Sequence, residues 1–458
     1  MNNFKKITIC LLLSLPMIVS CEKSFLEAKP DKSLLIPREL SDFQALLNNY
    51  QVMNFSGFLT ATAVDDIYTT NAGYTTALEL IRNAYIWKEG DMYGTSNVGD
   101  WNTPFQAVYY ANVVLDGLSE IQVTAENQKE ADRLKGQALF YRAFSFYSLA
   151  QQFAKPYSSA NQNSPGIPIR LKANVLIKSV RGTLEQTYKQ ILEDLLAAEA
   201  LLPLTVSFKS MPRKDAGYAL LARVYLTMHN YPKALEYADK CLQINNQLLN
   251  YNNLVLTSAR PFPVSFKDQN NEVLFSNTMI SAGFLTSPTT TLISTELYNS
   301  YRSDDLRKTA FFTSNANGVI FKGNYSGSGG VFSGLALDEV FLIRAECHAR
   351  LGNTQLAMID LNTLMRNRWN NKVPFPVFTA TDAKDALRQI LTERRKELVY
   401  RNTRWTDLRR LNQENDFAVT LTRNVNNVVY TLAPNSNRYV FSIPEYEIAA
   451  SGIEQNER

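Results

Sequence analysis

Residues 217–241 read Gly-Tyr-Ala-Leu-Leu-Ala-Arg-Val-Tyr-Leu-Thr-Met-His-Asn-Tyr-Pro-Lys-Ala-Leu-Glu-Tyr-Ala-Asp-Lys-Cys, and this stretch decides the fold class. Apolar and small residues recur three and four positions apart on both sides of His229-Asn230, which indicates two helices joined by a short turn. Pro232 suits the first turn of the second helix, where a backbone N–H would lack a partner in any case. The stretch therefore predicts a closely packed helix pair.

A second stretch repeats this spacing 123 residues further on, with Ala345, His348, Gly352-Asn353 at the turn, Ala357 and Leu361. The alternation of small and aromatic positions in both stretches is typical of tetratricopeptide repeats, in which small residues let paired helices approach closely. Residues 105–118 and 132–154 look like a third pair with weaker repeat identity. The copies are separated, so we expect helix pairs within a larger fold and not a tandem array.

Helical periodicity dominates the rest of the chain, whereas strand signals are sparse. The strongest helical stretches are 104–122, 128–153, 183–201, 213–228, 231–243, 335–351, 354–368, 382–400 and 403–411. Short strand candidates are 272–276, 319–321, 428–432 and 439–443. The sequence thus predicts a mainly α fold with tetratricopeptide-like helix pairs and a few short β-ribbons.

The first 21 residues have the form of a bacterial lipoprotein signal: a basic head, an apolar run and small residues ending at Cys21. The apolar run from Ile7 to Val19 is too short to cross a hydrocarbon core of roughly 30 Å as a helix. Ile18-Val19-Ser20-Cys21 resembles a lipobox, whose cysteine is acylated and becomes the first residue after cleavage. We therefore expect removal of residues 1–20 and lipidation at Cys21.

The remaining chain is expected to form a lipidated strap, 21–40, and a single body, 41–458. Helix-repeat parts lie near 104–245 and 335–412, and between them a loop-rich insert near 250–334 is rich in Asn, Ser, Thr, Gly and aromatic residues. Long irregular segments in compact bodies are commonly functional, so we expect this insert to face a ligand. Segment 64–101 has the same aromatic character.

Composition excludes several functional classes. The formal net charge is only +4, which gives no electrostatic case for nucleic acid. Cys241 and Cys347 remain after the signal and the lipidated cysteine are set aside, and both fall on packed helices, so no disulfide framework is expected. His229 and His348 fit the repeat register, and no metal-ligand or nucleophile motif is found. We expect no metal, no cofactor and no catalytic residues.

The densest charged motif is Glu393-Arg394-Arg395-Lys396-Glu397-Leu398 followed by Arg404-Trp405-Thr406-Asp407-Leu408-Arg409-Arg410. Charges of both signs at helical spacing can pair with each other, which favours a salt-bridged helix face. The alternative interpretation of the motif in isolation is an anion site built from its arginines.

This motif strongly resembles the SusD/RagB family of outer-membrane nutrient-binding lipoproteins. Matches along nearly the whole mature chain support the resemblance: the Cys21 lipobox, Trp101 with Tyr109 and Asn112, Tyr141-Arg142-Ala143-Phe144, Gly166-Ile-Pro168, Glu339 to Glu346, Ile443-Pro444-x-x-Glu447 and Gln455-Asn456. Each block is weak by itself, but their order and spacing together are specific.

The resemblance implies a helical body with tetratricopeptide-like repeats, anchored by lipid at the outer membrane and exposed at the cell surface. It further implies a SusC-like TonB-dependent transporter as partner and oligosaccharides as ligands. Motif residues would then be structural: Arg142, Glu393, Arg395 and Trp405.

The family motif does not fix the ligand residues, so the aromatic loops supply the candidates. Sugar rings present apolar C–H faces that stack on flat aromatic side chains. The predicted ligand-binding residues are Tyr85, Trp87, Tyr93, Tyr298 and Tyr325.

Three alternatives stay open. The chain could be a tetratricopeptide-type scaffold lipoprotein that binds proteins, or it could bind peptides in place of glycans. A surface hydrolase would need two carboxyl groups about 5–10 Å apart, and the adjacent acids Asp65-Asp66 and Asp304-Asp305 suit caps or turns better.

Overall fold

The computed structural model describes residues 37–266, 270–280 and 283–458. The chain divides into a short unit, 1–38, and a large unit, 39–458, which contains the helices and strands given below. The predicted signal peptide 1–20, Cys21 and most of the predicted strap 21–40 lie outside the described residues. Within the described ranges, no helix has the length and apolar character needed to cross a membrane.

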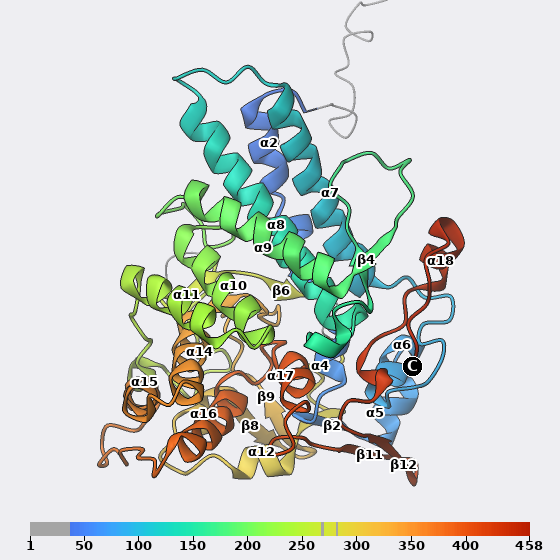
Figure 1. Ribbon diagram of the computed structural model, residues 1–458. Helices are drawn as coiled ribbons and strands as arrows, with labels where there is room; N and C mark the ends of the chain where they lie inside the picture. The colour runs from blue at the N-terminus through green and yellow to red at the C-terminus, as the bar shows by residue number, and fades with distance from the viewer. Residues whose placement is uncertain (1–36, 267–269, 281–282) are drawn as a thin grey trace, which may run out of the picture. The chain divides into compact units, whose positions relative to one another are not determined.

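Helices account for most of the regular structure (Figure 1). The longer ones are α2 (Leu40–Leu47), α7 (Gly99–Glu120), α8 (Gln128–Phe153), α9 (Leu184–Leu201), α10 (Lys214–Thr227), α11 (Tyr231–Ile244), α14 (Leu337–Arg350), α15 (Thr354–Arg366), α16 (Ala383–Glu397) and α17 (Arg404–Leu411). The shorter ones are α3 (Tyr50–Met53), α4 (Leu59–Thr62), α5 (Asn71–Thr76), α6 (Glu79–Tyr85), α12 (Thr295–Asn299), α13 (Arg307–Phe311), α18 (Glu445–Ser451) and the 3₁₀ turns η3 (Ser159–Asn161), η4 (Tyr251–Asn253) and η5 (Asn437–Tyr439). The prediction of a mainly helical fold is confirmed.

The two repeat-like stretches form the predicted pairs, α10 with α11 and α14 with α15, and α11 also packs against α14. The Asn230 side chain accepts the Lys233 N–H at 3.2 Å, which satisfies one of the free donors at the start of α11. Tyr225 and Tyr237 stack across the first pair, with ring centroids 5.6 Å apart. Small and aromatic positions therefore interlock as the repeat pattern predicts.

A second group of helices consists of α7, α8 and α9, with α8 packed between the other two. Arg142 on α8 donates two hydrogen bonds to Asp194 on α9, at 2.8 and 2.7 Å, and a third to Asn112 on α7 at 2.9 Å. This buried side chain fixes the three helices in one register.

The strands form two-stranded ribbons. They are β1 (Phe55–Ser56), β2 (Ile67–Thr69), β3 (Pro165–Pro168), β4 (Arg181–Thr183), β5 (Val273–Phe275), β6 (Thr278–Met279), β7 (Thr291–Ile293), β8 (Phe312–Asn315), β9 (Gly318–Phe321), β10 (Leu335–Ala336), β11 (Leu421–Val425) and β12 (Val428–Leu432). Three of the four predicted strands coincide with β5, β9 and β12. The fourth, 439–443, is not a strand, because η5 ends at Tyr439 and the next residues turn back to α8, where Phe441 donates to the Gln152 carbonyl.

The insert between the repeat pairs is not a free loop but packs on the N-terminal part of the body. The pair β1–β6 is parallel and the pair β2–β7 is antiparallel, and each joins residues more than 200 positions apart. Aromatic rings of the insert pack on each other, with Phe262 4.9 Å from Tyr325 and 5.3 Å from Tyr251 between centroids. The insert thereby contributes a large part of the hydrophobic core.

A buried ion network joins the insert to α16; its members are Glu272, Asp305, Arg307, Arg368, Glu393, Lys396 and Glu397. Arg307 is fully buried and pairs with Asp305 at 2.7 Å, with Glu397 at 3.0 Å and with Glu393. Arg368 pairs with Glu397 at 2.7 Å and with Glu272 at 2.9 Å. The charges within this network satisfy each other, which is what allows them to be buried.

Candidate functional site

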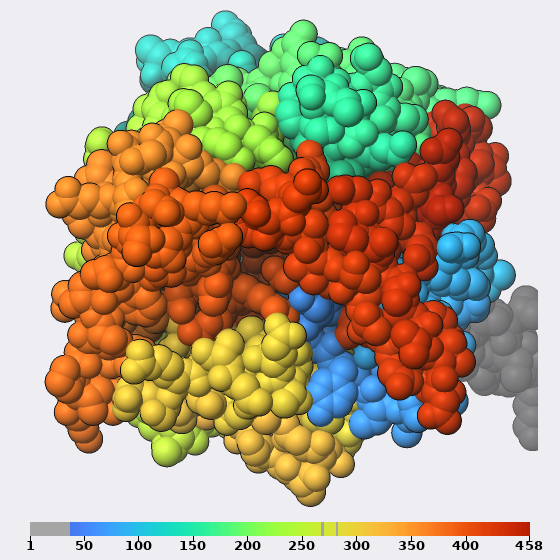
Figure 2. All heavy atoms as spheres, turned by 60° about the horizontal axis from the view of Figure 1, so that its bottom comes forward, coloured from blue at the N-terminus to red at the C-terminus, as the bar shows by residue number. Residues whose placement is uncertain are grey.

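Four segments that are distant in the sequence surround an open cleft of about 490 Å³. The segments are 65–69 around β2, 294–296 at the start of α12, Arg395 of α16 and 419–424 leading into β11. Figure 2 shows a hollow where the parts coloured blue, yellow, orange and red meet. A cleft of this volume falls within the range of small-ligand sites, roughly 300–1,000 Å³. We call it the cleft.

The charged groups of the cleft are paired with each other. Arg395 lies 3.0 Å from Asp65, 3.3 Å from Asp66 and 3.4 Å from Glu296. Burial by itself would raise the pKa of the Asp65 carboxyl, but the guanidinium groups of Arg404 and Arg395 outweigh it and hold that pKa well below its usual range. Burial raises the pKa of the Asp66 carboxyl, opposed by Arg395. The Asp65 carboxyl is therefore ionised; it pairs with Arg404, and its ion pair with Arg395 forms one wall of the cleft.

Tyr68 supplies an exposed aromatic ring at the cleft. Along β2, Ile67 and Thr69 point inward whereas Tyr68 is 39% exposed, as the two-residue period of a strand requires. Tyr68 falls within the aromatic segment 64–101 but is not among the five predicted ligand-binding residues. The alternation of Ile67-Tyr68-Thr69 is the signal that could have identified it.

Another part of the cleft lining is a strip of hydroxyl and amide groups. Thr420, Thr422 and Asn424 alternate with buried residues along the segment that forms β11, and all three are exposed. The buried residue Arg423 donates to the carbonyls of Ile67 and Val64, which ties this strip to β2. The cleft thus combines one ring with several neutral hydrogen-bonding groups and paired charges.

The five predicted ligand-binding aromatics are not gathered at one surface. Trp87 is 1% exposed and its indole N–H donates to the Ala63 carbonyl at 2.8 Å. The Tyr93 hydroxyl donates to the Ser442 carbonyl at 2.9 Å, and the Tyr325 ring is buried between Phe262 and Phe332. These three rings therefore belong to the core: the polar groups of Trp87 and Tyr93 bond to backbone carbonyls, and the Tyr325 ring packs on other rings.

The other two aromatics lie in different environments. Tyr85 is a buried ring at the edge of the cleft; its hydroxyl accepts the Thr69 N–H at 3.0 Å and the Arg423 guanidinium lies 4.0 Å from its centroid. Tyr298 on α12 is half-buried, with the Lys308 ammonium 4.6 Å from its ring. The structure places neither beside Tyr68 as a stacking platform.

The motif residues Glu393, Trp405 and Arg395 occupy three environments. Glu393 belongs to the buried ion network, and Trp405 packs on Tyr439 with ring centroids 4.8 Å apart. Arg395, which the sequence groups with them as structural, lines the cleft and pairs there with Asp65 and Asp66, so its structural role stays a prediction.

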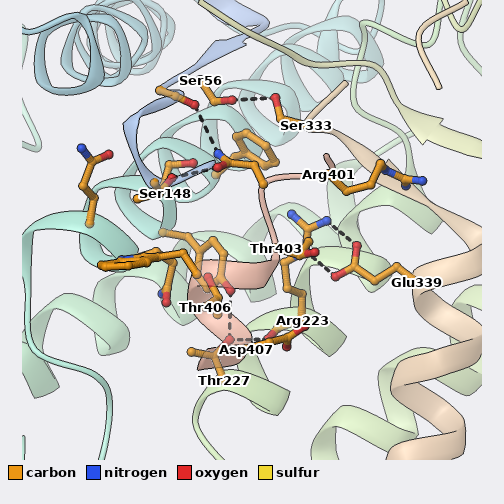
Figure 3. A pocket seen from close by; sticks show the side chains of 18 of the residues that line it. Ser56, Ser148, Arg223, Thr227, Ser333, Glu339, Arg401, Thr403, Thr406 and Asp407 are labelled. Carbon is orange, nitrogen blue, oxygen red and sulfur yellow. Dashed lines mark hydrogen bonds and ion pairs between the residues drawn. The ribbon is translucent and has the colours of Figure 1, made fainter. Parts of the chain in front are cut away.

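A second space, the inner cavity, lies beneath the N-terminal turn of α17 and has a volume of about 50 Å³. Figure 3 shows Ser56, Ser148, Thr227 and Thr403 around it, together with Arg223 and Glu339. A sugar ring does not fit a space of this size. The inner cavity can therefore hold only an ion or a few water molecules, unlike the larger cleft.

Neither space offers metal ligands. Among the described residues, no group of three or more His, Cys, Asp or Glu side chains is placed to hold a metal ion. Cys241 and Cys347 are buried free thiols, and burial raises the pKa of both.

Comparisons with known proteins agree with this architecture. A SusD-like family described as "Starch-binding associating with outer membrane" matches residues 24–226, and the SusD_RagB family, described as "SusD family", matches residues 336–456. SusD-like protein P2 of Formosa agariphila is 28% identical over 148 residues, which cover 32% of this chain and 27% of that protein.

Solved structures extend the similarity to most of the chain. A putative sugar binding protein from Bacteroides vulgatus is 21% identical with a TM-score of 0.73, and the match covers 92% of this chain and 99% of that one. A SusD superfamily protein from Bacteroides thetaiotaomicron is 21% identical with a TM-score of 0.74 over 92% and 100% of the two chains. The fold and the two matched families, one at each end of the body, establish that this chain belongs to the SusD/RagB family.

Proposed function

We propose that this protein binds oligosaccharides at the cell surface without cleaving them and passes them to a SusC-like TonB-dependent transporter in the outer membrane. The cleft carries the proposal, because an exposed tyrosine and a strip of threonine and asparagine side chains line one space of about 490 Å³. A ring can stack on the apolar face of a sugar while hydroxyl and amide groups bond its rim. The paired acids at the wall fit a binding role, since Asp65 is held ionised by two guanidinium groups.

The relatives support the same class of ligand. One matched family is described as starch-binding and associated with the outer membrane, and one similar solved structure is named as a putative sugar binding protein. Delivery to a transporter rests on the family alone, whereas attachment through Cys21 rests on the signal pattern of residues 1–21 and on the family.

Tyr68→Ala is expected to weaken oligosaccharide binding about two- to twelve-fold, because an aromatic stacking contact contributes roughly 0.5–1.5 kcal/mol beyond area burial. The melting temperature should not change, since Tyr68 is exposed on a short ribbon. Isothermal titration calorimetry against oligosaccharides, beginning with maltooligosaccharides, measures the affinity. Chromatography of the recovered ligand should show that it is intact.

Tyr109→Ala is the matched control, because Tyr109 on α7 is equally exposed at 41% but does not line the cleft. Equal losses in both variants would contradict the assignment of the cleft. Binding of peptides and of no oligosaccharide would favour the peptide alternative.

Cys21→Ala is expected to release the protein from the outer membrane, because the acylated cysteine would be its lipid attachment. Membrane fractionation of cells that lack the partner transporter measures the release. Cys10→Ala is the control, since Cys10 lies within the predicted signal peptide and its loss should leave anchoring intact. Firm membrane attachment of Cys21→Ala would disprove the lipid anchor.

A further inference from the structure

The inner cavity is lined by polar atoms that have no partner within the described residues. The buried donors are the Arg394 Nη1, Arg401 Nε, Trp405 Nε1 and Gln152 Nε2 groups and the Thr403 hydroxyl. These side chains are between 1% and 7% exposed. A buried donor without an acceptor is costly, so five of them on residues that line one space indicate a ligand that accepts hydrogen bonds.

The N-terminus of α17 adds donors to the same space. Thr403 is the N-cap residue, but its side chain makes no capping bond. The first backbone N–H groups of a helix have no intrahelical acceptor, and the helix dipole makes this end attractive to negative charge. The residues at this turn, Thr403, Trp405 and Thr406, all line the cavity.

The neighbouring carboxylates are already engaged. Asp407 accepts from Arg394 Nε at 2.8 Å and from Arg410 Nε at 2.9 Å, and Glu339 accepts from Arg223 Nε at 2.8 Å. The unpartnered acceptor among the lining side chains is Asp100 Oδ2, and the Gln152 amide beside it is the nearest of the donors. Donors therefore exceed acceptors in this cavity.

We infer that the inner cavity binds a small monovalent anion of chloride size at the N-terminus of α17. An anion accepts several N–H and O–H groups and needs no acceptor itself, whereas each water must place two protons of its own. A volume of about 50 Å³ leaves space for the ion and a water or two. A divalent anion is disfavoured, because Asp338 and Glu346 behind the wall neutralise Arg401 and Arg410.

The position of the anion links it to the cleft. Arg404 follows Thr403 directly and donates to both oxygens of Asp65 at 2.8 Å, and Asp65 also pairs with Arg395. An anion that orders the first turn of α17 thereby holds the charged wall of the cleft in place.

Thermal unfolding in sodium chloride, bromide, gluconate and sulfate at one ionic strength tests the inference. Chloride and bromide should raise the midpoint in a saturable way, and gluconate and sulfate should not. At ten times the dissociation constant, the folding equilibrium shifts about eleven-fold, which corresponds to roughly 1–3 °C. Equal midpoints in all four salts would overturn the inference.

A matched pair of variants locates the effect. Thr403→Val removes one donor and should abolish or strongly weaken the halide response. Thr291→Val removes another buried, unpartnered hydroxyl outside the cavity and should keep the full response. Similar responses in both variants would contradict the site.

Anomalous diffraction from crystals of the unmodified protein grown in bromide provides a measurement that does not depend on the variants. A bromide peak within the cavity between Thr403, Arg394 and Trp405 is expected. Density for water alone, without an anomalous peak, would overturn the inference.

Discussion

Arg307→Met is expected to lower the free energy of unfolding by about 3–5 kcal/mol, because removing one partner of a buried ion pair leaves uncompensated charge. Arg307 has no exposed surface and pairs with Asp305, Glu393 and Glu397. These three carboxylates outweigh burial and raise the pKa of the Arg307 guanidinium above its ordinary value, so its charge is always present. Urea denaturation followed by circular dichroism measures the loss.

The matched control is Lys189→Met, which removes a surface pair with Glu193 at 3.8 Å. Exposed pairs of this spacing contribute roughly 0.3–0.5 kcal/mol, so its effect should be small. The deficit of Arg307→Met should shrink as the pH falls, because the orphaned carboxylates can then be protonated in the folded state. A loss below 1 kcal/mol at neutral pH would contradict the role given to this network.

Trp405→Ala is expected to cost about 3–5 kcal/mol, as large-to-small substitutions of buried aromatic residues do. Trp405 is 1% exposed and contacts Tyr439 and Phe441 at centroid distances of 4.8 and 5.6 Å. It thereby holds α17 against the C-terminal segment. Differential scanning calorimetry measures the change.

Trp405→Phe keeps an aromatic ring at this position and should recover a large part of the stability. Oligosaccharide affinity per folded molecule is the second measurement for both variants. A Trp405→Ala protein that is as stable as the unmodified chain and has lost only ligand binding would show that Trp405 is a ligand residue and not a structural one.

Most of the long helices could be predicted to within a few residues because their signals are local, whereas short helices such as α5, α12 and α18 are not among the predicted stretches. The stretches 128–153 and 231–243 coincide with α8 and α11 within one residue. Helix α7 begins at Gly99 and not at Pro104, because Asp100 and Trp101 already form its first turn. Caps, periodicity and small-residue positions act over a few residues, so a single sequence contains them.

The ribbons and the burial of the insert could not be predicted in the same way. Strand β6 has two residues, and its partner β1 lies more than 200 positions away. The aromatic residues of the insert look like a binding surface in sequence, but Tyr251, Phe262 and Tyr325 pack on one another. Whether an aromatic side chain contacts solvent or another ring depends on partners that local patterns do not specify.

The cleft likewise contains one residue with a local sequence signal and one whose position depends on distant partners. Arg395 was classed with the motif, and only the folded structure places it beside Asp65 and Glu296. Tyr68 has a local signal, the alternation along β2, and could have been chosen over its neighbours. The role of the five predicted aromatics in ligand binding stays a prediction.

The way in which the cleft is assembled has a consequence for folding kinetics. One of the hydrogen bonds that close it joins Arg423 to the Ile67 carbonyl across 356 positions of the chain. Contacts of such separation form slowly, because the entropy of closing a long loop is lost before the contact stabilises anything. The N-terminal half can build its helices during synthesis, but the cleft cannot exist until β11 has emerged. A chain that stops before residue 419 is therefore expected to be helical and yet unable to form the binding site.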